Sequence, residues 1–415
     1  MTKPNRGYLA VGLAGLAYLI AVTQRTTMGS VALDASTRFH TNAQQLSSLA
    51  VMQLVFYAAM QVPVGILLDR FGSRKLLASG AVLMAIGQVV VGLSDALPTA
   101  IVGRILVGVG DACTFISMMR MSNSWFSGKI ASHLQQWLAT IGQTGQILSA
   151  IPFAMLLHMT SWESAFVSAS AMSLLIAVVV WVFANENPAK EIHHSVKLTD
   201  VFAKLRSNTR RPVTWLAFFT HFTTQSTGTT FALLWGVPFM VSALALPRAT
   251  AGGFLTLFVI TNASMGPLIG LFCARFPKRR QWFVLGVVAS IVTVWLLVVS
   301  HQGVTPIWLL TALVMIIGVG GPSSMIAFDY SKEAFSANEL GATNGLINVG
   351  GFLASLTMMW IVGLSLDLQG GPNLYTLEHF RVAFALQLVV TGIGLVGFLL
   401  SWRSFRNTFP SKTLL

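Results

Sequence analysis

Long apolar stretches recur along the whole chain. Each is about 20 residues long, the length that a helix needs to cross the ~30 Å hydrocarbon core of a bilayer. In lipid, a spanning segment must satisfy its backbone polar groups internally, which favours helices. Charged residues make up 9% of the 415 residues, far below the roughly 25% of soluble domains. The period-two alternation of an outer-membrane barrel is absent from the sequence. The chain is therefore predicted to be an all-α integral membrane protein embedded in the lipid bilayer.

The apolar stretches form two sets of six. We predict twelve transmembrane helices, at 8–33, 46–68, 76–94, 98–121, 134–157, 163–184, 212–240, 250–273, 282–300, 304–328, 340–366 and 380–402. The longest polar interruption separates the sixth helix from the seventh. We expect an N-terminal six-helix bundle over 1–184, a cytoplasmic linker over 185–211 and a C-terminal six-helix bundle over 212–415.

Basic residues collect in alternate loops of this arrangement. Of the 26 lysines and arginines, all but six fall in segments on one side of the predicted membrane. The six exceptions are Arg38, Arg248 and Arg381 on the other side, and Arg25, Arg104 and Arg120 within helices. Because loops rich in Lys and Arg stay in the cytoplasm, we predict an inner-membrane protein with both termini in the cytoplasm. The net charge of +13 then gives no reason to expect nucleic acid as a partner.

The two predicted bundles resemble each other in sequence. "TQRT" at 23–26 recurs as "TQST" at 224–227, and "GILLDRFGSRK" from Gly65 recurs as "GLFCARFPKRR" from Gly270. "GVGD" at 108–111 matches "GVGG" at 318–321, and "ATIG" at 139–142 matches "ATNG" at 342–345. The matches keep one order at nearly constant spacing. Paired six-helix repeats are typical of secondary transporters, which bind substrate between the repeats.

The loop between the second and third predicted helices carries a specific motif. Its residues are Gly65, Asp69, Arg70, Gly72, Arg74 and Lys75. The motif resembles the loop motif of the major facilitator superfamily, and the resemblance covers the whole chain. It implies a gate in which Asp69 pairs with Arg70 or Arg74 and caps the start of helix eleven through the helix dipole. The second copy has Ala274 and Pro277 in place of the acid and the glycine, so the same role is not implied there.

Asp111 is the one acidic residue that the sequence places in the middle of a predicted helix. An ionisable residue within a membrane is costly and indicates a functional site by default. Burial favours the neutral form of a carboxyl, which lets such a group load and release a proton. We therefore predict that Asp111 couples transport to protons. The alternative is a permanently ionised structural partner for a buried arginine.

Two arginines are predicted to accompany Asp111. Arg104 lies seven residues earlier on the same helix face, and "RILVGVGDA" resembles the superfamily's helix-four motif, whose arginine lines the cavity or supports proton transfer. "VTQRTTMGSVALDA", "NSWFSGKIASH" and "SWESAF" resemble the organic anion:cation symporter branch, which implies that Arg25 binds a substrate carboxylate. A guanidinium suits that role because it offers two parallel donors. The acid that usually precedes this arginine is Gln24 here, which leaves Asp111 to carry the coupling alone. The alternative for Arg25 is that it balances the charge of Asp111.

Uncharged polar side chains complete the predicted substrate site. With Gln24, Arg25 and Arg104, they are Gln53, Tyr57, Gln143, Gln146, His221, Gln225, Asn344 and Asn348. Each of them has the alternative role of hydrogen-bonding a neighbouring helix. The two cysteines lie in different apolar segments and no Walker-type loop occurs, so we expect no metal, no cofactor and no ATP.

Together these features predict a proton-coupled secondary transporter that works by rocking of its two halves. We expect symport of a small organic anion by a monomer. The alternative is a proton-driven efflux antiporter for hydrophobic or cationic compounds, although helix five, "GQTGQILSAIP", lacks the glycine-proline signature of such antiporters. An enzyme would need a cluster of catalytic groups at membrane depth, which Asp111 alone does not provide.

Overall fold

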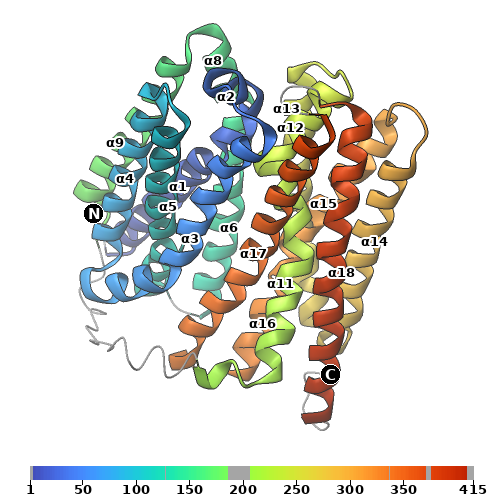
Figure 1. The fold of residues 1–415 in the computed structure, drawn as a ribbon. Helices are drawn as coiled ribbons and strands as arrows, with labels where there is room; N and C mark the ends of the chain where they lie inside the picture. The colour runs from blue at the N-terminus through green and yellow to red at the C-terminus, as the bar shows by residue number, and fades with distance from the viewer. Residues whose placement is uncertain (1–2, 127, 186–205, 336, 371–374, 409–415) are drawn as a thin grey trace. The chain divides into compact units, whose positions relative to one another are not determined.

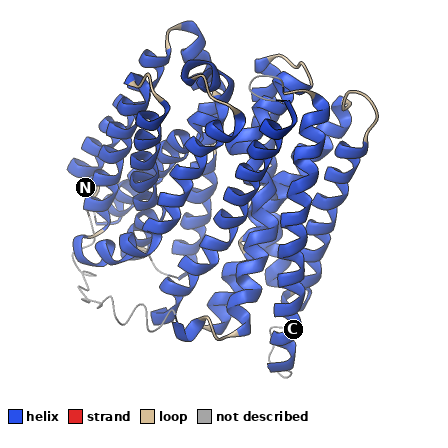
Figure 2. Ribbon diagram, in the orientation of Figure 1, coloured by secondary structure: helices blue, strands red, loops and turns tan. Residues whose placement is uncertain are grey.

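The computed structural model describes residues 3–126, 128–185, 206–335, 337–370 and 375–408 (Figure 1). Within these ranges the chain consists of helices joined by turns and short loops, and no strand occurs (Figure 2). Ten of the described helical stretches are long and apolar enough to cross a bilayer. The other two predicted ranges are occupied by α3 (Ala43–Phe71) and by the long helix that begins with α11 (Pro212–Thr230). The all-α prediction is confirmed.

By its packing the chain divides into two units. The first contains Met1–Val31 and Leu49–Lys197, and the second contains Ala32–Ser48 and Leu198–Leu415. Compared with the predicted bundles, a segment from the early part of the chain, 32–48, packs with the second unit. Residues 186–205, which make up most of the predicted linker, lie outside the described residues.

The first unit is organised around α5 (Leu97–Trp125), which carries Asp111. It packs along α4 (Ser73–Leu93) and α1 (Lys3–Ser30). Further contacts join α4 and α1 to α9 (Trp162–Phe183) and α1 to α6 (Gly128–Gln143). The fifth predicted helix continues beyond α6 as α7 (Gly145–Leu148), the π-helical turn η1 (Ser149–Phe153) and α8 (Ala154–Met159). Pro152 lies in that turn, and both features are common causes of a local change in helix direction.

The second unit is organised around α11. This helix contacts α15 (Ile307–Ser324), α16 (Ile326–Ala334), α17 (Ala337–Gly370) and α18 (Leu377–Thr408). It continues through η3 (Phe231–Trp235), α12 (Gly236–Pro238) and η4 (Phe239–Ala243). The outer helices are α13 (Arg248–Arg275), packed on α15, and α14 (Arg280–Ser300), which follows the 3-10 turn η5 (Pro277–Arg279) and packs on α15 and α18.

The first helix ends earlier than predicted. We predicted one helix to residue 33, but α1 ends at Ser30, and after Val31 a separate short helix, α2 (Ala32–Phe39), begins. The sequence shows the reason: Asp34 and Arg38 would have to enter the membrane if an apolar helix continued here. In α2 one face is buried, and the charged residues lie on the remaining surface.

Gly72 makes the turn between α3 and α4 on its own. Its backbone has φ 80° and ψ 169°, a conformation that is essentially restricted to glycine. Gly65 of the same motif lies in the helix interior, and a Cβ added there would meet no atom within 4 Å. The motif therefore contains one glycine that the backbone requires and one that it does not.

We expect Gly72→Ala to lower stability by about 1–3 kcal/mol, because alanine is strained in this backbone conformation. Gly65→Ala is the matched control and should leave stability unchanged or raise it slightly, since alanine is the better helix former. Thermal unfolding of the purified variants measures both effects. Equal melting temperatures for the two variants would contradict the distinction.

Candidate substrate and proton site

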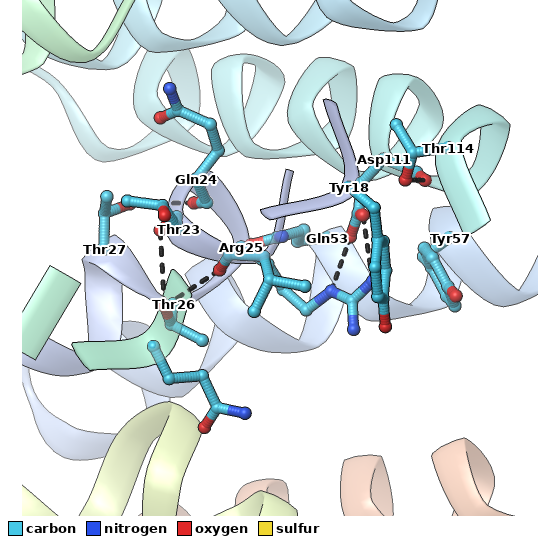
Figure 3. A network of polar contacts seen from close by, with 12 residues as sticks. Tyr18, Thr23, Gln24, Arg25, Thr26, Thr27, Gln53, Tyr57, Asp111 and Thr114 are labelled. Carbon is cyan, nitrogen blue, oxygen red and sulfur yellow. Dashed lines mark hydrogen bonds and ion pairs between the residues drawn. The ribbon is translucent and has the colours of Figure 1, made fainter. Parts of the chain in front are cut away.

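Arg25 and Asp111 form a close ion pair within the first unit (Figure 3). The Arg25 Nε donates to Asp111 Oδ2 at 2.6 Å, and Arg25 Nη2 donates to Oδ1 at 2.9 Å. Asp111 is fully buried, whereas the Arg25 side chain is 12% exposed. The pair therefore joins α1 to α5 by two parallel hydrogen bonds, and its arginine end is the more accessible one.

Tyr57 of α3 lies beside this pair. Its ring faces the Arg25 guanidinium, with 4.8 Å from Arg25 Cζ to the ring centroid. Such stacking stabilises a cation without using its hydrogen-bond donors. The guanidinium thus has an ion-pair partner and an aromatic neighbour, both from helices of the first unit.

Arg104 is also fully buried, and it binds backbone and side-chain oxygens of α1 and the side chain of Gln53 on α3. Its guanidinium donates to the carbonyl of Arg25 at 3.0 Å, to the Thr27 hydroxyl at 3.2 Å and to the side-chain oxygen of Gln53. Arg104 and Asp111 both contact Arg25, as expected for two residues on one face of α5. Arg104 donates no hydrogen bond to Asp111, so it holds the α1 segment rather than the carboxylate.

The network of Arg25, Arg104 and Asp111 contains two guanidinium groups and one carboxylate. With the carboxylate ionised, its formal charge is +1. Water does not screen buried charges well, so an excess positive charge here attracts an anion and repels a cation. Arg25 is the member with exposed surface, and it is therefore where an anion would bind.

Gln24 points away from this pair, into the packing of α1 against α4 and α9. Its amide nitrogen donates to the carbonyl of Ala169 at 2.6 Å and to the Ser173 hydroxyl at 2.7 Å. Gln88 in turn donates to the Gln24 side-chain oxygen at 2.6 Å. Gln24 is fully buried, so in this structure it cross-links helices instead of facing a substrate.

A second series of side-chain hydrogen bonds connects α1 to α6 and α7, which belong to the fifth predicted helix. Gln146 donates to Gln143 at 2.6 Å, and Gln143 donates to the Tyr18 hydroxyl at 2.9 Å. Tyr18 lies on α1 seven residues before Arg25, and Figure 3 shows its ring next to the Arg25–Asp111 pair. We did not predict Tyr18 as a site residue. Its spacing from Arg25, two helical turns on one face, was the available signal.

The four predicted residues of the second unit form three separate contacts. His221 Nε2 lies 3.2 Å from Asn348 Oδ1, which joins α11 to α17. The Ser324 hydroxyl donates to Gln225 at 3.4 Å, and the Ser331 hydroxyl donates to Asn344 at 2.6 Å. Each residue thus has a partner within the second unit, in accordance with a helix-linking role, and none of the four is fixed by an ion pair.

The structure describes part of the predicted gating motif. Arg74 donates to Asn185 at 3.0 Å and its Cζ lies 5.2 Å from the Trp181 ring centroid, while Arg70 stacks on Phe71. Lys75 is exposed. The Asp69 side chain lies outside the described residues, so its predicted cap stays a prediction. In the second copy, Arg280 is buried and pairs with Glu333 at 2.6 Å, a contact that the basic character of the loop did not reveal.

Among the described residues, no group of three His, Cys, Asp or Glu side chains is placed to hold a metal ion. The site consists of a buried ion pair with hydrogen-bonded polar neighbours in a multi-pass α-helical membrane protein. Ionisable groups at membrane depth that pair with one another are typical of the solute and proton pathways of membrane proteins.

The match to known families is specific. The model of the Major Facilitator Superfamily matches residues 14–237 and again residues 217–413, so each half of the sequence matches it separately. The chain belongs to the Major Facilitator Superfamily and is a membrane transporter. The predicted family is therefore confirmed, as is the prediction that the protein is not an enzyme.

Curated relatives match most of the chain at low identity. The hexuronate transporter of Escherichia coli (strain K12) is 23% identical over 432 residues, which covers 98% of this chain and 95% of the relative. The nitrite extrusion protein of Bacillus subtilis (strain 168) is 20% identical, with 85% and 87% coverage. A probable galactarate/D-glucarate transporter of the same Bacillus strain is 22% identical and covers 76% of each chain.

A solved structure shows the same fold. The crystal structure of a bacterial homologue of the human lysosomal transporter Spinster, inward-facing and unoccupied, superposes with a TM-score of 0.78 at 16% identity. The superposition covers 98% of this chain and 99% of the other. This confirms the predicted major facilitator fold.

Proposed function

We propose that this transporter carries a small organic anion into the cell together with a proton. The observation that supports the proposal most is the buried network with two guanidiniums and one carboxylate, in which Arg25 alone is partly exposed. The substrate carboxylate binds the Arg25 fork, and the aromatic ring of Tyr57 remains stacked on the same guanidinium.

The proton acts by releasing Arg25. While Asp111 is ionised, it occupies Nε and Nη2 of Arg25, one of the two edges through which a guanidinium binds a carboxylate by paired hydrogen bonds. A proton from the outside binds a carboxylate oxygen of Asp111 and removes its charge, which weakens the pair and frees the guanidinium. After the change of access, Asp111 loses the proton to the cytoplasm, pairs with Arg25 again and displaces the anion. The ion pair seen here is then the resting state of the cycle.

The replacement of an acid by Gln24 sets the stoichiometry. Gln24 is neutral and its amide is held by Ala169, Ser173 and Gln88, so it takes no part in proton binding. Asp111 then carries one proton per cycle. One proton with one monovalent anion moves no net charge, and uptake of such a substrate is independent of membrane voltage.

The names of the relatives support an anionic substrate. Two relatives described above are named as carriers of hexuronate and of galactarate or D-glucarate, which are carboxylates, and a third as an exporter of nitrite. A cation is disfavoured as cargo because it would have to approach a site with excess positive charge. We therefore favour hydroxylated carboxylates over the hydrophobic or cationic compounds of the efflux alternative.

The transport cycle also depends on the orientation of the protein, on the polar residues of the second unit and on the gating motif. The protein is a monomer of the inner membrane with both termini in the cytoplasm, and residues 185–211 link its two halves. His221, Gln225, Asn344 and Asn348 of the second unit complete substrate recognition when their present partners are exchanged for substrate hydroxyls. The gating motif from Gly65 to Lys75 controls access on the cytoplasmic side.

Uptake into proteoliposomes tests the proposed function. The purified protein is given D-glucuronate, D-glucarate, lactate, glucose or a cationic dye, with the outside one pH unit more acidic than the inside. We expect accumulation of a carboxylate, and none of glucose or the dye. Accumulation of the dye under the opposite gradient, or carboxylate uptake that ignores the pH gradient, would contradict the proposal.

A further inference from the structure

Residues 32–48 occupy an unusual place in the packing of the chain. They contain α2 and the first turns of α3, and they pack with the second unit, whereas the sequence on both sides of them belongs to the first unit. Within the second unit, α2 contacts α12. The segment is thus bonded covalently to one unit at both ends and packed on the other.

The first turn of α3 is capped from two directions. Asn42 and Gln45 cap each other reciprocally: Gln45 N donates to Asn42 Oδ1 at 2.8 Å, and Asn42 N donates to Gln45 Oε1 at 3.2 Å. The two N–H groups that this local cap leaves open, those of Ala43 and Gln44, donate to the Asp367 carboxylate of α17 at 2.7 Å each. One carboxylate from the second unit therefore completes the cap of a helix that continues into the first unit.

α17 approaches α3 closely at this cap. One turn before Asp367 lies Gly363, where an added Cβ would meet the Ala43 carbonyl oxygen at 2.9 Å and the Ser47 hydroxyl at 3.0 Å. Nearby, burial together with the Asp367 carboxylate raises the pKa of the Tyr375 hydroxyl to about 12, so this group stays neutral at physiological pH. Helix capping and close packing thus occur at the same place.

A second tie lies on α2. Asp34 accepts from Arg248 Nη1 at 2.8 Å and 2.7 Å, and this pair joins α2 to the start of α13. The pair is partly exposed, with 46% of the Arg248 side chain accessible, so it contributes less than the half-buried, doubly bonded Asp367 cap.

We propose that residues 32–48 are a releasable latch, with Asp367 as its principal holding group. This inference rests on the proposed alternating-access cycle. In a rocking cycle the first unit changes its position relative to the second, and α3 must then either leave the Asp367 carboxylate or separate from the rest of its own unit. The cap is therefore made in one access state and broken in the other. In the proposed orientation the latch lies on the outer side of the membrane, opposite the motif from Gly65 to Lys75.

Chemical labelling tests the latch without substrate or proton gradient. Ser47 is fully buried against Gly363, so Ser47→Cys, in a chain with Cys113 and Cys273 replaced by serine, reports opening through its reaction with a membrane-impermeant maleimide. We expect Asp367→Asn to raise the labelling rate about tenfold, because loss of a charged helix cap costs on the order of 1 kcal/mol and 1.4 kcal/mol corresponds to a factor of about ten. Asp34→Asn should raise it about twofold, as is typical of an exposed pair. The control Glu378→Gln, an exposed acid of the same unit, should leave the rate unchanged.

A cross-link provides the second measurement, which does not depend on whether Asp367→Asn folds. With a small shift of the Ala43 carbonyl to admit the Cβ that Gly363→Cys adds, we expect the Ser47→Cys/Gly363→Cys pair to form a disulfide, to block D-glucuronate uptake when oxidised and to recover uptake on reduction. The latch would be overturned if Asp367→Asn left the labelling rate unchanged. It would also be overturned if the oxidised cysteine pair transported D-glucuronate as fast as the same pair after reduction. Failure of the proposed function would look different, because no carboxylate would be transported by any variant while labelling would still respond to Asp367.

Discussion

We expect Asp111→Asn to abolish proton-driven accumulation while leaving exchange of labelled for unlabelled substrate intact. Electroneutral symport with one proton concentrates a monovalent anion about tenfold per pH unit, since each pH unit corresponds to about 1.4 kcal/mol. Asparagine has the shape of the protonated aspartate but cannot release a proton, so the accumulation ratio should fall to one. Apparent substrate affinity should rise, because no carboxylate competes for Arg25. Uptake and counterflow in the same proteoliposomes measure both quantities.

Two controls separate coupling from folding in this experiment. Asp111→Glu keeps a titratable group and should retain some pH-driven accumulation. The elution profile of each variant in size-exclusion chromatography shows whether it folds, which matters because Arg25 loses its buried counter-charge in Asp111→Asn. If Asp111→Asn still concentrated the anion in response to a pH gradient, Asp111 would not be the coupling residue.

Arg25→Gln should reduce transport of the anion by about 30-fold to about 4,000-fold in kcat/KM. Removing one partner of a buried, hydrogen-bonded charge pair costs about 2–5 kcal/mol in binding, and each 1.4 kcal/mol is a factor of about ten. Arg25→Lys keeps the charge but loses the two-donor fork, so it should still lose about tenfold. Uptake kinetics with the substrate identified in the screen give these values.

The double variant Arg25→Gln/Asp111→Asn distinguishes binding from stability. Arg25→Gln alone leaves the Asp111 carboxylate buried without its partner, which should lower stability by about 3–5 kcal/mol. Removing both charges should recover most of that stability without recovering transport. An Arg25→Gln protein with undiminished anion affinity would remove the anchor role and favour a neutral or cationic substrate.

The fold could be predicted from the sequence because hydropathy marks the segments that cross the membrane and basic loops mark the cytoplasmic side. Twelve apolar ranges and one motif from Gly65 to Lys75 predicted the superfamily, and the predicted helix ends lie within six residues of those in the structure. The helix ends are less predictable, since turns such as Val31 depend on what the following residues pack against. For α2 that surface is part of the second unit, far away in sequence.

The candidate site was predictable by residue type but not by orientation. The scarcity of charges in spanning segments singled out Arg25, Arg104 and Asp111, and the structure brings all three together. Gln24, next to Arg25, was grouped with the substrate site, yet adjacent residues on a helix point about 100° apart, and Gln24 faces α4 and α9 instead. The packing of α1 decides which of its two adjacent residues, Gln24 or Arg25, faces Asp111. That packing cannot be read from a single sequence.

The ratio of proton flux to anion flux tests proton-coupled symport most directly. A pH-sensitive dye inside proteoliposomes and a labelled carboxylate monoanion outside report the two fluxes in one experiment, with membrane voltage set by potassium and valinomycin. We predict that one proton enters with each anion and that the voltage has no effect on the rate. Anion entry without protons, or protons leaving as the anion enters, would contradict proton-coupled symport through Asp111.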